Sequence, residues 1–445
     1  MILENKFRQS RESIVLKDRE WVARMLVQFQ VRNFRSIREM VTFSFLAAKI
    51  KSQNPNVDKE NTFIHSSGLK LLKSATIYGA NASGKSNILA AFRIMRFIVL
   101  TQQQKDQSIA VEAFRLSDNF ANKPTFFEVI FFIKKTQYRY GFEATTLEVI
   151  SEWLYQIPES KKQESMLFFR ENSNLKLSNF FKEGRLIKKE NKTLKNALFL
   201  TTCSNFNGEI SGLIFDWFKK SFVFSGLNDK TYLDVTLHAI QEEKMQQNIL
   251  SLINKLDLSI ENIQSKARET SEGSIWQPLP LDLARLFQSV YAGKTLHKTY
   301  DSDDNFKTYE EFDLEENESS GTQKLIAIAY PILTAINNGI LILIDELDAK
   351  LHPLITFAII RLFNSSDNKN GSQLLFTTHD TNLLNKDIFR RDQIWFTEKD
   401  QVGATSLYSL AEFKVRNDAS FEKDYINGRY GAIPFINSEK LVTHE

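Results

Sequence analysis

Residues 79–86 read Gly-Ala-Asn-Ala-Ser-Gly-Lys-Ser, and this stretch decides the fold. It follows an apolar run over 71–78, which we predict to be a strand, and it opens a helix predicted over 85–100. The pattern G-x-x-x-x-G-K-[ST] between a strand and a helix is typical of a phosphate-binding loop, whose backbone N–H groups and helix N-terminus surround phosphate oxygens. A chance glycine-rich turn is the alternative, and the strand and helix on either side disfavour it.

The residues of this loop have separate expected roles. Lys85 is expected to reach the β- and γ-phosphates of a nucleotide, and Ser86 is expected to ligate Mg²⁺. ATP and Mg²⁺ are therefore the expected cofactors. The residues expected to contact the nucleotide here are Gly79, Ala80, Asn81, Ala82, Ser83, Gly84, Lys85, Ser86 and Asn87.

Two carboxylates end a second apolar run. Asp345 and Glu346 follow residues 340–344, Ile-Leu-Ile-Leu-Ile. Carboxylates beside the end of a buried strand cost free energy unless they have partners or a function. We expect Asp345 to hold Mg²⁺ directly or through water, and we expect Glu346 to polarise the attacking water. An acidic helix cap is the alternative.

Two further motifs stand at fixed distances from this acidic pair. Residues 318–323 read Glu-Ser-Ser-Gly-Thr-Gln before a predicted helix, and Ser320 precedes Asp345 by 25 residues (345 − 320 = 25). Residues 377–380 read Thr-Thr-His-Asp after another apolar strand. Together with the phosphate-binding loop, they resemble the signature and the switch histidine of the ABC ATPases. Glu318 departs from that pattern, because the family usually has a leucine there.

The resemblance implies roles for these residues. The signature residues would face the γ-phosphate held by a partner subunit, and His379 would contact the γ-phosphate, which makes Glu346, His379 and Lys85 the expected catalytic residues. Asp348 resembles the residue that crosses a dimer interface. The signature residues assigned to nucleotide contact are Ser319, Ser320, Gly321 and Gln323. Residues 31–37 resemble the first strand and turn of the SMC and RecF group, which nominates Arg35 as a nucleotide contact; a surface arginine is the alternative.

Alternating strands and helices at both ends of the sequence predict an α/β fold with a mainly parallel sheet. With the resemblance, we expect an ABC-type P-loop nucleotide-binding domain with an inserted, mainly helical subdomain. The predicted segments are an N-terminal extension (1–24, with Met25 as the alternative start), an N-lobe (25–147), the inserted subdomain (148–312), a C-lobe (313–415) and a tail (416–445).

Composition excludes several classes of protein. The 445 residues carry a net charge of +3, which gives no global basic field for nucleic acid, and the single Cys203 excludes a disulfide framework and a cysteine zinc site. The charged N-terminus is unlike a signal peptide, and no apolar run predicts a membrane span. We therefore expect a cytoplasmic protein that does not contact membranes. Lysines within 188–195 are expected to be a solvated surface, with nucleic-acid contact as the alternative.

The family resemblance also suggests a biological role. The spacing and the tail, above all 423–434, resemble the ABC-type AAA ATPases of bacterial phage-defence and abortive-infection systems, in particular the RloA/AbiLi-like branch, related to the OLD, Septu and retron ATPases. This implies a homo-oligomer, either an ATP-sandwich dimer or a higher assembly, that senses or regulates through a separate effector protein encoded nearby. The alternative is a DNA-repair or recombination ATPase that binds nucleic acid directly.

Overall fold

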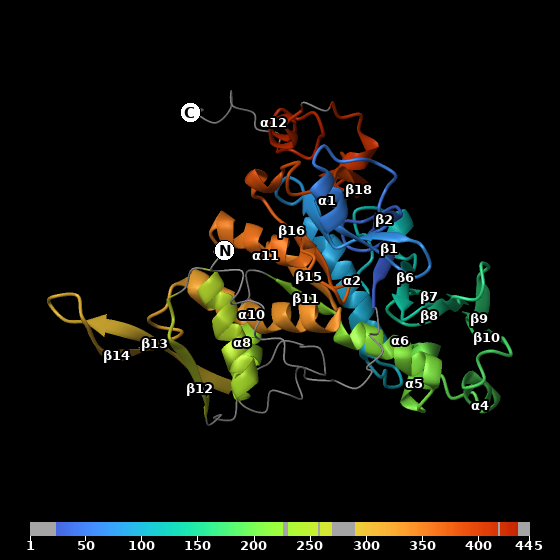
Figure 1. The fold of residues 1–445 in the computed structure, drawn as a ribbon. Coiled ribbons are helices and arrows are strands. Elements are labelled where there is room, and N and C mark those ends of the chain that lie inside the picture. The colour runs from blue at the N-terminus through green and yellow to red at the C-terminus, as the bar shows by residue number, and fades with distance from the viewer. Residues whose placement is uncertain (1–23, 226–229, 257–258, 269–289, 417–418, 435–445) are drawn as a thin grey trace, which may run out of the picture.

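The computed structural model describes residues 24–225, 230–256, 259–268, 290–416 and 419–434. Two large sheets with helices packed around them form the body, and a smaller three-stranded sheet projects from it (Figure 1). The predicted α/β class is therefore confirmed. Residues 1–23 of the predicted extension and the end of the predicted tail lie outside the described residues.

The first sheet is mainly parallel and has the strand order β11-β15-β16-β5-β17-β18. Strands β15, β16 and β5 pair in parallel, with Ile344 opposite Phe376 and Phe376 opposite Thr76. Because parallel strands end at one edge of a sheet, the loops that follow these three strands meet there. The strands are β5 Ser74–Tyr78, β11 Phe222–Ser225, β15 Leu341–Asp345, β16 Gln373–Thr377, β17 Ile394–Lys399 and β18 Thr405–Ser409.

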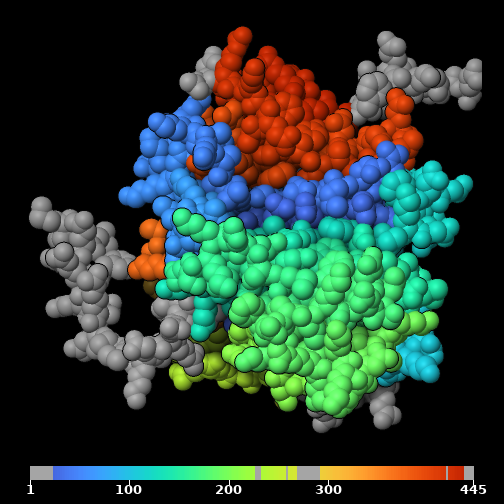
Figure 2. Space-filling model, turned by 90° about the vertical axis from the view of Figure 1, so that its right-hand side faces the viewer, coloured from blue at the N-terminus to red at the C-terminus, as the bar shows by residue number. Residues whose placement is uncertain are grey.

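The second sheet is antiparallel, in the order β10-β9-β8-β7-β6-β1-β2. Its strands are β1 Leu26–Arg32, β2 Val41–Ser44, β6 Thr125–Ile133, β7 Thr136–Ala144, β8 Val149–Ile157, β9 Ser165–Glu171 and β10 Asn174–Leu177. Figure 2 shows the side of the molecule where the first strands form a band between the C-terminal part above and the segment around residue 200 below.

Helix α2 (Lys85–Leu100) lies between the two sheets. Its Phe92 packs edge-to-face on Phe29 of β1, with ring centroids 5.5 Å apart. The same buried cluster contains Leu341 and Leu343 of β15. Helix α6 (Glu209–Lys220) extends this core. The phosphate-binding loop is thus attached to a helix that is fixed on both sides.

The segment 148–312 corrects the prediction of a mainly helical insertion. Its described part supplies β8, β9 and β10 to the antiparallel sheet and β11 to the parallel sheet. The aromatic and β-branched residues of 149–157 suit half-buried strands better than helices. The helices of the segment are α4 Gly184–Lys189, α5 Phe199–Asn205, α6, α7 Lys230–Ala239 and α8 Glu243–Lys255. Much of this segment therefore completes the two sheets instead of standing apart from them.

The projecting sheet consists of β12 (Asn262–Arg268), β13 (Val290–Tyr300) and β14 (Phe306–Asp313), and we call it the arm (Figure 1). Its root is fixed to α7, because the Ser265 hydroxyl donates to the Leu237 carbonyl. Helix α7 is bonded in turn to α10 (Ser320–Asn338), where the Thr236 hydroxyl donates to the Ala327 carbonyl at 2.9 Å. The arm, α7 and α10 thus form one connected unit.

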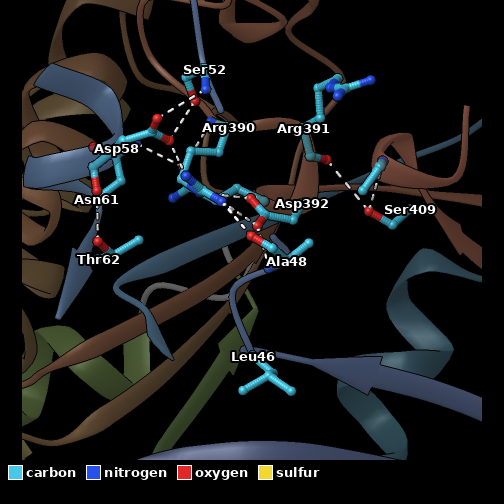
Figure 3. A network of polar contacts seen from close by, with 12 residues as sticks. Leu46, Ala48, Ser52, Asp58, Asn61, Thr62, Arg390, Arg391, Asp392 and Ser409 are labelled. Atoms are coloured by element: carbon cyan, nitrogen blue, oxygen red, sulfur yellow. Dashed lines mark hydrogen bonds and ion pairs between the residues drawn. The ribbon is translucent and has the colours of Figure 1, made fainter. Parts of the chain in front are cut away.

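A buried arginine joins the C-terminal part of the chain to the segment 46–62 (Figure 3). Arg390 is only 1% exposed. Its guanidinium forms ion pairs with Asp392 and Asp58 and donates to the Ala48 carbonyl. Two carboxylates and a carbonyl offset the cost of burying this charge. The short elements nearby are α1 Pro55–Glu60, β3 Thr62–Ile64, β4 Lys70–Leu72 and the 3₁₀ turns η2 Arg391–Gln393 and η3 Leu410–Glu412.

The described part of the tail packs on the body. In and after α12 (Phe421–Ile426), Tyr425 and Tyr430 stack on Phe396 of β17, with ring centroids 5.4 and 5.8 Å away. The remaining elements are α3 Asp118–Ala121, α11 Pro353–Asn364 and η1 Thr381–Leu383. Among the described helices, none combines the length and the apolar character that a membrane span requires.

Candidate functional site

Only glycine suits position 84 of the phosphate-binding loop. Gly84 precedes α2 with φ 108°, in the left-handed region that side chains disfavour. A Cβ at this position would also overlap the side chain of Thr405. The backbone of Gly84 can therefore approach β18 closely only because the residue has no side chain.

Four hydroxyl groups hold the loop in place, and we call them the hydroxyl clamp: Ser83 of the loop itself, and Ser36, Thr397 and Thr405 from elsewhere in the sequence. The Ser83 and Thr397 hydroxyls are 2.7 Å apart, and the Thr405 hydroxyl donates to the Ser83 carbonyl at 2.9 Å. Thr405 also contacts the Ser36 hydroxyl, which accepts a hydrogen bond from the Asn87 side chain. Of these residues, sequence reasoning had singled out only Ser83 and Asn87.

Lys85 is folded back onto its own loop. Its ammonium donates to the carbonyls of Gly79, at 2.8 Å, and Ala80, at 3.1 Å. Burial lowers the pKa of Lys85, and the nearby carboxylates of Asp345 and Glu346 oppose that change. The positive charge thus lies beside the acidic end of β15.

Thr377, at the end of β16, fixes the acidic pair. Its hydroxyl donates to a carboxylate oxygen of Asp345 at 2.6 Å and accepts from the backbone N–H of Glu346 at 2.7 Å. Glu346 has φ 53°, an uncommon conformation for a side-chain-bearing residue. Such local strain is often found at functional sites, where the surrounding contacts impose it.

A buried lysine of the signature helix holds the backbone after the acidic pair. Lys324 of α10 has no exposed surface, and its ammonium donates to the carbonyls of Glu346, Leu347 and Ala349. This lysine connects α10 directly to the segment that carries Glu346. In the sequence, a lysine within the apolar run of 322–336 is an unusual feature that could have indicated this role.

His379 and Asp348 lie beside these groups. The His379 backbone N–H donates to Asp348 at 3.3 Å. Burial, and then the charge of Lys85, lower the pKa of His379, although Asp348, Glu346 and Asp345 oppose them. The lowered pKa favours the neutral form of the imidazole. The other carboxylate oxygen of Asp348 is buried without a hydrogen-bond partner among the described residues.

The signature residues are held by contacts within their own chain. The Ser319 hydroxyl caps α10 by accepting from the Thr322 N–H at 3.1 Å. The Gln323 side chain donates to the Glu318 carbonyl at 2.9 Å. A Cβ at Gly321 would come within 2.8 Å of the Lys350 carbonyl. Among the described residues, no hydrogen bond joins residues 319–321 to residues 79–86 of the same chain.

Within the described part of the chain, the side chain of Arg35 forms no hydrogen bond with the loop; the next residue, Ser36, bonds to Asn87, just after the loop. The Arg35 guanidinium donates twice to the Glu112 carboxylate, at 2.8 and 3.1 Å. The adjacent Ser36 belongs to the hydroxyl clamp. A contact between Arg35 and a nucleotide therefore stays a prediction, and it would have to form beside the Glu112 ion pair.

The donor groups present fit Mg²⁺. Asp345 offers a carboxylate, and the exposed Ser86 offers a hydroxyl at the start of α2. Mg²⁺ prefers such oxygen ligands and often completes its shell with water and substrate phosphates. Within the described residues, no group of three or more histidine, cysteine or acidic side chains could hold a metal ion unaided. Ser86 and Asp345 would therefore share the ion with phosphate oxygens.

Comparison with solved structures finds distant similarity to SMC head domains. The SMC head domain from Thermotoga maritima aligns with 12% identity over 88% of this chain and all of its own, with a TM-score of 0.39. An Smc head domain bound to a domain of ScpA from Pyrococcus furiosus aligns with 14% identity over 92% of this chain and 99% of its own, with a TM-score of 0.35. These likenesses are too distant to bear on function. No curated protein matches the sequence.

A family model, in contrast, matches most of the chain. The match runs over residues 74–385, from β5 to beyond His379, and so includes the phosphate-binding loop, the signature and the acidic pair. The chain therefore belongs to the family described as "AAA domain, putative AbiEii toxin, Type IV TA system".

Proposed function

We propose that this protein binds ATP with Mg²⁺ and hydrolyses it to ADP and phosphate, as an ABC-type ATPase. One observation carries the proposal: a lysine, three carboxylates and a histidine converge at the edge where β5, β15 and β16 end. The converging residues are Lys85, Asp345, Glu346, Asp348 and His379. A buried lysine and half-buried carboxylates beside a glycine-rich loop favour a site for a charged substrate.

Each side chain has a task in this reaction. Lys85 would leave its loop carbonyls and bind the β- and γ-phosphates, and Glu346 would take a proton from the attacking water. The neutral His379 would donate a hydrogen bond to the γ-phosphate. Ser86 and Asp345 would hold Mg²⁺, which when bound neutralises charge on the phosphates.

A second copy of the chain would complete the site. Ser320 is exposed at the N-terminus of α10, a helix of 19 residues. The first backbone N–H groups of such a helix favour anions. Residues 319–321 form no hydrogen bond with residues 79–86 of their own chain, among the residues described. In a dimer, each α10 would point its N-terminus at the γ-phosphate held by the other copy.

We further propose a role in phage defence or abortive infection, in which this ATPase regulates a separate effector. The description of the family as a putative toxin of a Type IV TA system supports this role. In such a system, ATP would hold two copies together and hydrolysis would release them. The effector would respond to that change of state.

Phosphate release at fixed ATP and Mg²⁺ tests the proposed activity. Lys85→Ala and Glu346→Gln should each slow hydrolysis by about 10²–10³-fold, because each removes a group that acts on the transition state. Lys59→Ala, a change at an exposed lysine of α1, is the matched control and should hydrolyse like wild type. Full activity in both site variants would overturn the proposal.

The role in defence needs a second measurement. The measurement is the mass of Glu346→Gln in solution, with and without ATP. We expect an assembly that forms only when nucleotide is present. We also expect that assembly to bind the protein encoded by the neighbouring gene. Assembly could instead be independent of nucleotide and of that protein, while DNA stimulates hydrolysis with a steep salt dependence. That result would show an ATPase that acts on DNA and would contradict the role in defence.

A further inference from the structure

Glu318 connects the arm to the signature. This residue immediately precedes Ser319, and its side chain is only 9% exposed. Its carboxylate accepts a hydrogen bond from the Thr295 hydroxyl and lies 2.7 Å from Nε2 of His297. Both partners belong to β13, the central strand of the arm. The residue that departs from the ABC pattern is thus the one that the arm holds.

The arm approaches the signature closely at this point. Thr295 is fully buried, and the Leu314 N–H, just after β14, donates to the Gly293 carbonyl at 3.0 Å. A Cβ at Gly293 would lie 2.7 Å from the Leu314 side chain, so a larger residue would push the two apart. The root of the arm therefore has little freedom to shift relative to residues 314–318.

Glu318 is held from both sides. The Gln323 side chain of α10 donates to its backbone carbonyl, whereas Thr295 and His297 of the arm hold its carboxylate. Ser319, the next residue, caps α10. A rotation of Glu318 would thus change the direction in which Ser319 and Ser320 present their hydroxyls.

We propose that Glu318 is a positioning residue that couples the arm to ATP hydrolysis. The inference rests on the proposed function, in which the signature of one copy acts on the nucleotide of the other. The contacts of Glu318 with Thr295 and His297 set the orientation of Ser320. A displacement of the arm then alters hydrolysis without any change in the phosphate-binding loop.

The shape of the arm suits this role. It projects from the body beyond α8 and α10 (Figure 1). Its outer part carries exposed aromatic side chains, with Tyr300 57% exposed and Phe306 52% exposed. The described side chains of β14 are almost all exposed, so the body supports the arm mainly at its root. A force applied to the outer part therefore acts on the contacts of Glu318.

The test compares Glu318→Gln and Glu318→Leu with Glu311→Gln. Glu311 lies on β14 and pairs with Lys294, and among the described residues it forms no hydrogen bond or ion pair with residues 318–323, so it provides the same chemical change on the same arm. Both Glu318 variants should lower kcat by about 10-fold, the scale expected when a reacting group is slightly misplaced. Nucleotide affinity at the phosphate-binding loop and Tm should stay close to wild type, as should every property of Glu311→Gln.

A double-mutant cycle identifies the contact. If Glu318 acts through His297, then Glu318→Gln combined with His297→Gln should be no slower than Glu318→Gln alone. Additive losses would show that the two residues act separately. A Glu318 variant with wild-type kcat, or one with lower Tm and raised KM at unchanged kcat, would overturn the proposal.

Two comparisons separate this proposal from the proposed function. In the same assay, Lys85→Ala reports on the ATPase activity itself, so normal turnover in that variant counts against the proposed function and not against the coupling. The coupling has its own readout in ATP-dependent assembly. Adding Glu318→Gln to Glu346→Gln should weaken assembly, whereas adding Glu311→Gln should not; equal assembly in both would count against the coupling.

Discussion

The two halves of the candidate site are built in different ways. The phosphate-binding loop follows the end of β5, an inner strand of the parallel sheet, and the hydroxyl clamp fixes it there through Ser36, Thr397 and Thr405. The signature lies at the surface, where a helix cap, the Gln323 side chain and the carboxylate of Glu318 hold it. The loop is therefore fixed by the fold, whereas the signature depends on a few contacts that reach to the arm.

This difference indicates where regulation can act. A loop that many contacts hold binds its ligand with little rearrangement, because its ordering has already been completed during folding. A signature with few contacts can change orientation at small cost. Substitutions in the loop should therefore damage binding and stability together, whereas substitutions around the signature should mainly change the rate of turnover.

The largest expected effect tests the fixed half. Gly84→Ala places a side chain in the left-handed region and against Thr405, so the free energy of unfolding should fall by about 2–5 kcal/mol and nucleotide binding should be lost. Gly212→Ala in α6, where a Cβ meets open space, is the control and should gain up to about 1 kcal/mol. Denaturant unfolding and nucleotide titration measure both. Normal binding by Gly84→Ala would show that the loop is not fixed in this way.

The next effect tests the connection between the halves. Lys324→Met leaves the carbonyls that follow the acidic pair without their buried donor, which should cost about 2–4 kcal/mol and also slow hydrolysis. Lys73→Met is the matched control, because Lys73 is also buried and donates to the carbonyls of Asn364 and Ser365, away from the site. It should lose stability but keep its turnover per folded molecule. Equal turnover in the two variants would contradict the role of Lys324.

A smaller effect separates binding from turnover. Thr405→Val removes the hydroxyl that bonds the Ser83 carbonyl, so nucleotide affinity should fall by about 10-fold while kcat at saturation changes little. Thr299→Val on the arm removes a similar hydroxyl-to-carbonyl bond and is the control. Calorimetric titration of a non-hydrolysable ATP analogue measures the difference. A lower kcat with unchanged nucleotide affinity would contradict this prediction, because Thr405 would then affect turnover, as the signature is expected to, and not binding.

The smallest effect concerns pH. The pKa of His379 in the folded protein lies below its ordinary value, which is about 6.5. As pH falls below that value, the unfolded chain binds a proton on this residue more readily than the folded chain, so the folded protein loses stability until the folded-state pKa is passed. Tm should therefore fall more between pH 7.5 and 5.5 in wild type than in His379→Gln. Parallel curves for the two proteins would show that the imidazole is not held in its neutral form.

Features that depend on local sequence could be predicted. The predicted helix over 85–100 is confirmed as α2, and the apolar run over 340–344 lies in and just before β15, as expected of a buried strand. The strand predicted over 71–78 is interrupted at Lys73, which turns inward to bond the end of α11. These elements have strong periodicity and clear end signals, and such signals act over a few residues.

Features that depend on sheet order could not be predicted. Thr397 and Thr405 reach the loop only because β17 pairs with β5 and β18 pairs with β17. Threonine is common in strands, so neither residue stands out in the sequence. The strands of 149–177 were missed because the whole segment 148–312 was predicted to be mainly helical. The nomination of Arg35 drew on resemblance and did not anticipate its pairing with Glu112.

The hydroxyl clamp has a consequence for the synthesis of the protein. The loop at residues 79–86 is made early, yet Thr397 and Thr405 leave the ribosome more than 300 residues later. Strand β5 also gains its neighbours β16 and β17 only at that late stage. Such non-local pairing is slow to form. A chain that is still being translated, or one cut short before residue 397, would therefore carry the whole phosphate-binding motif without the contacts that shape it.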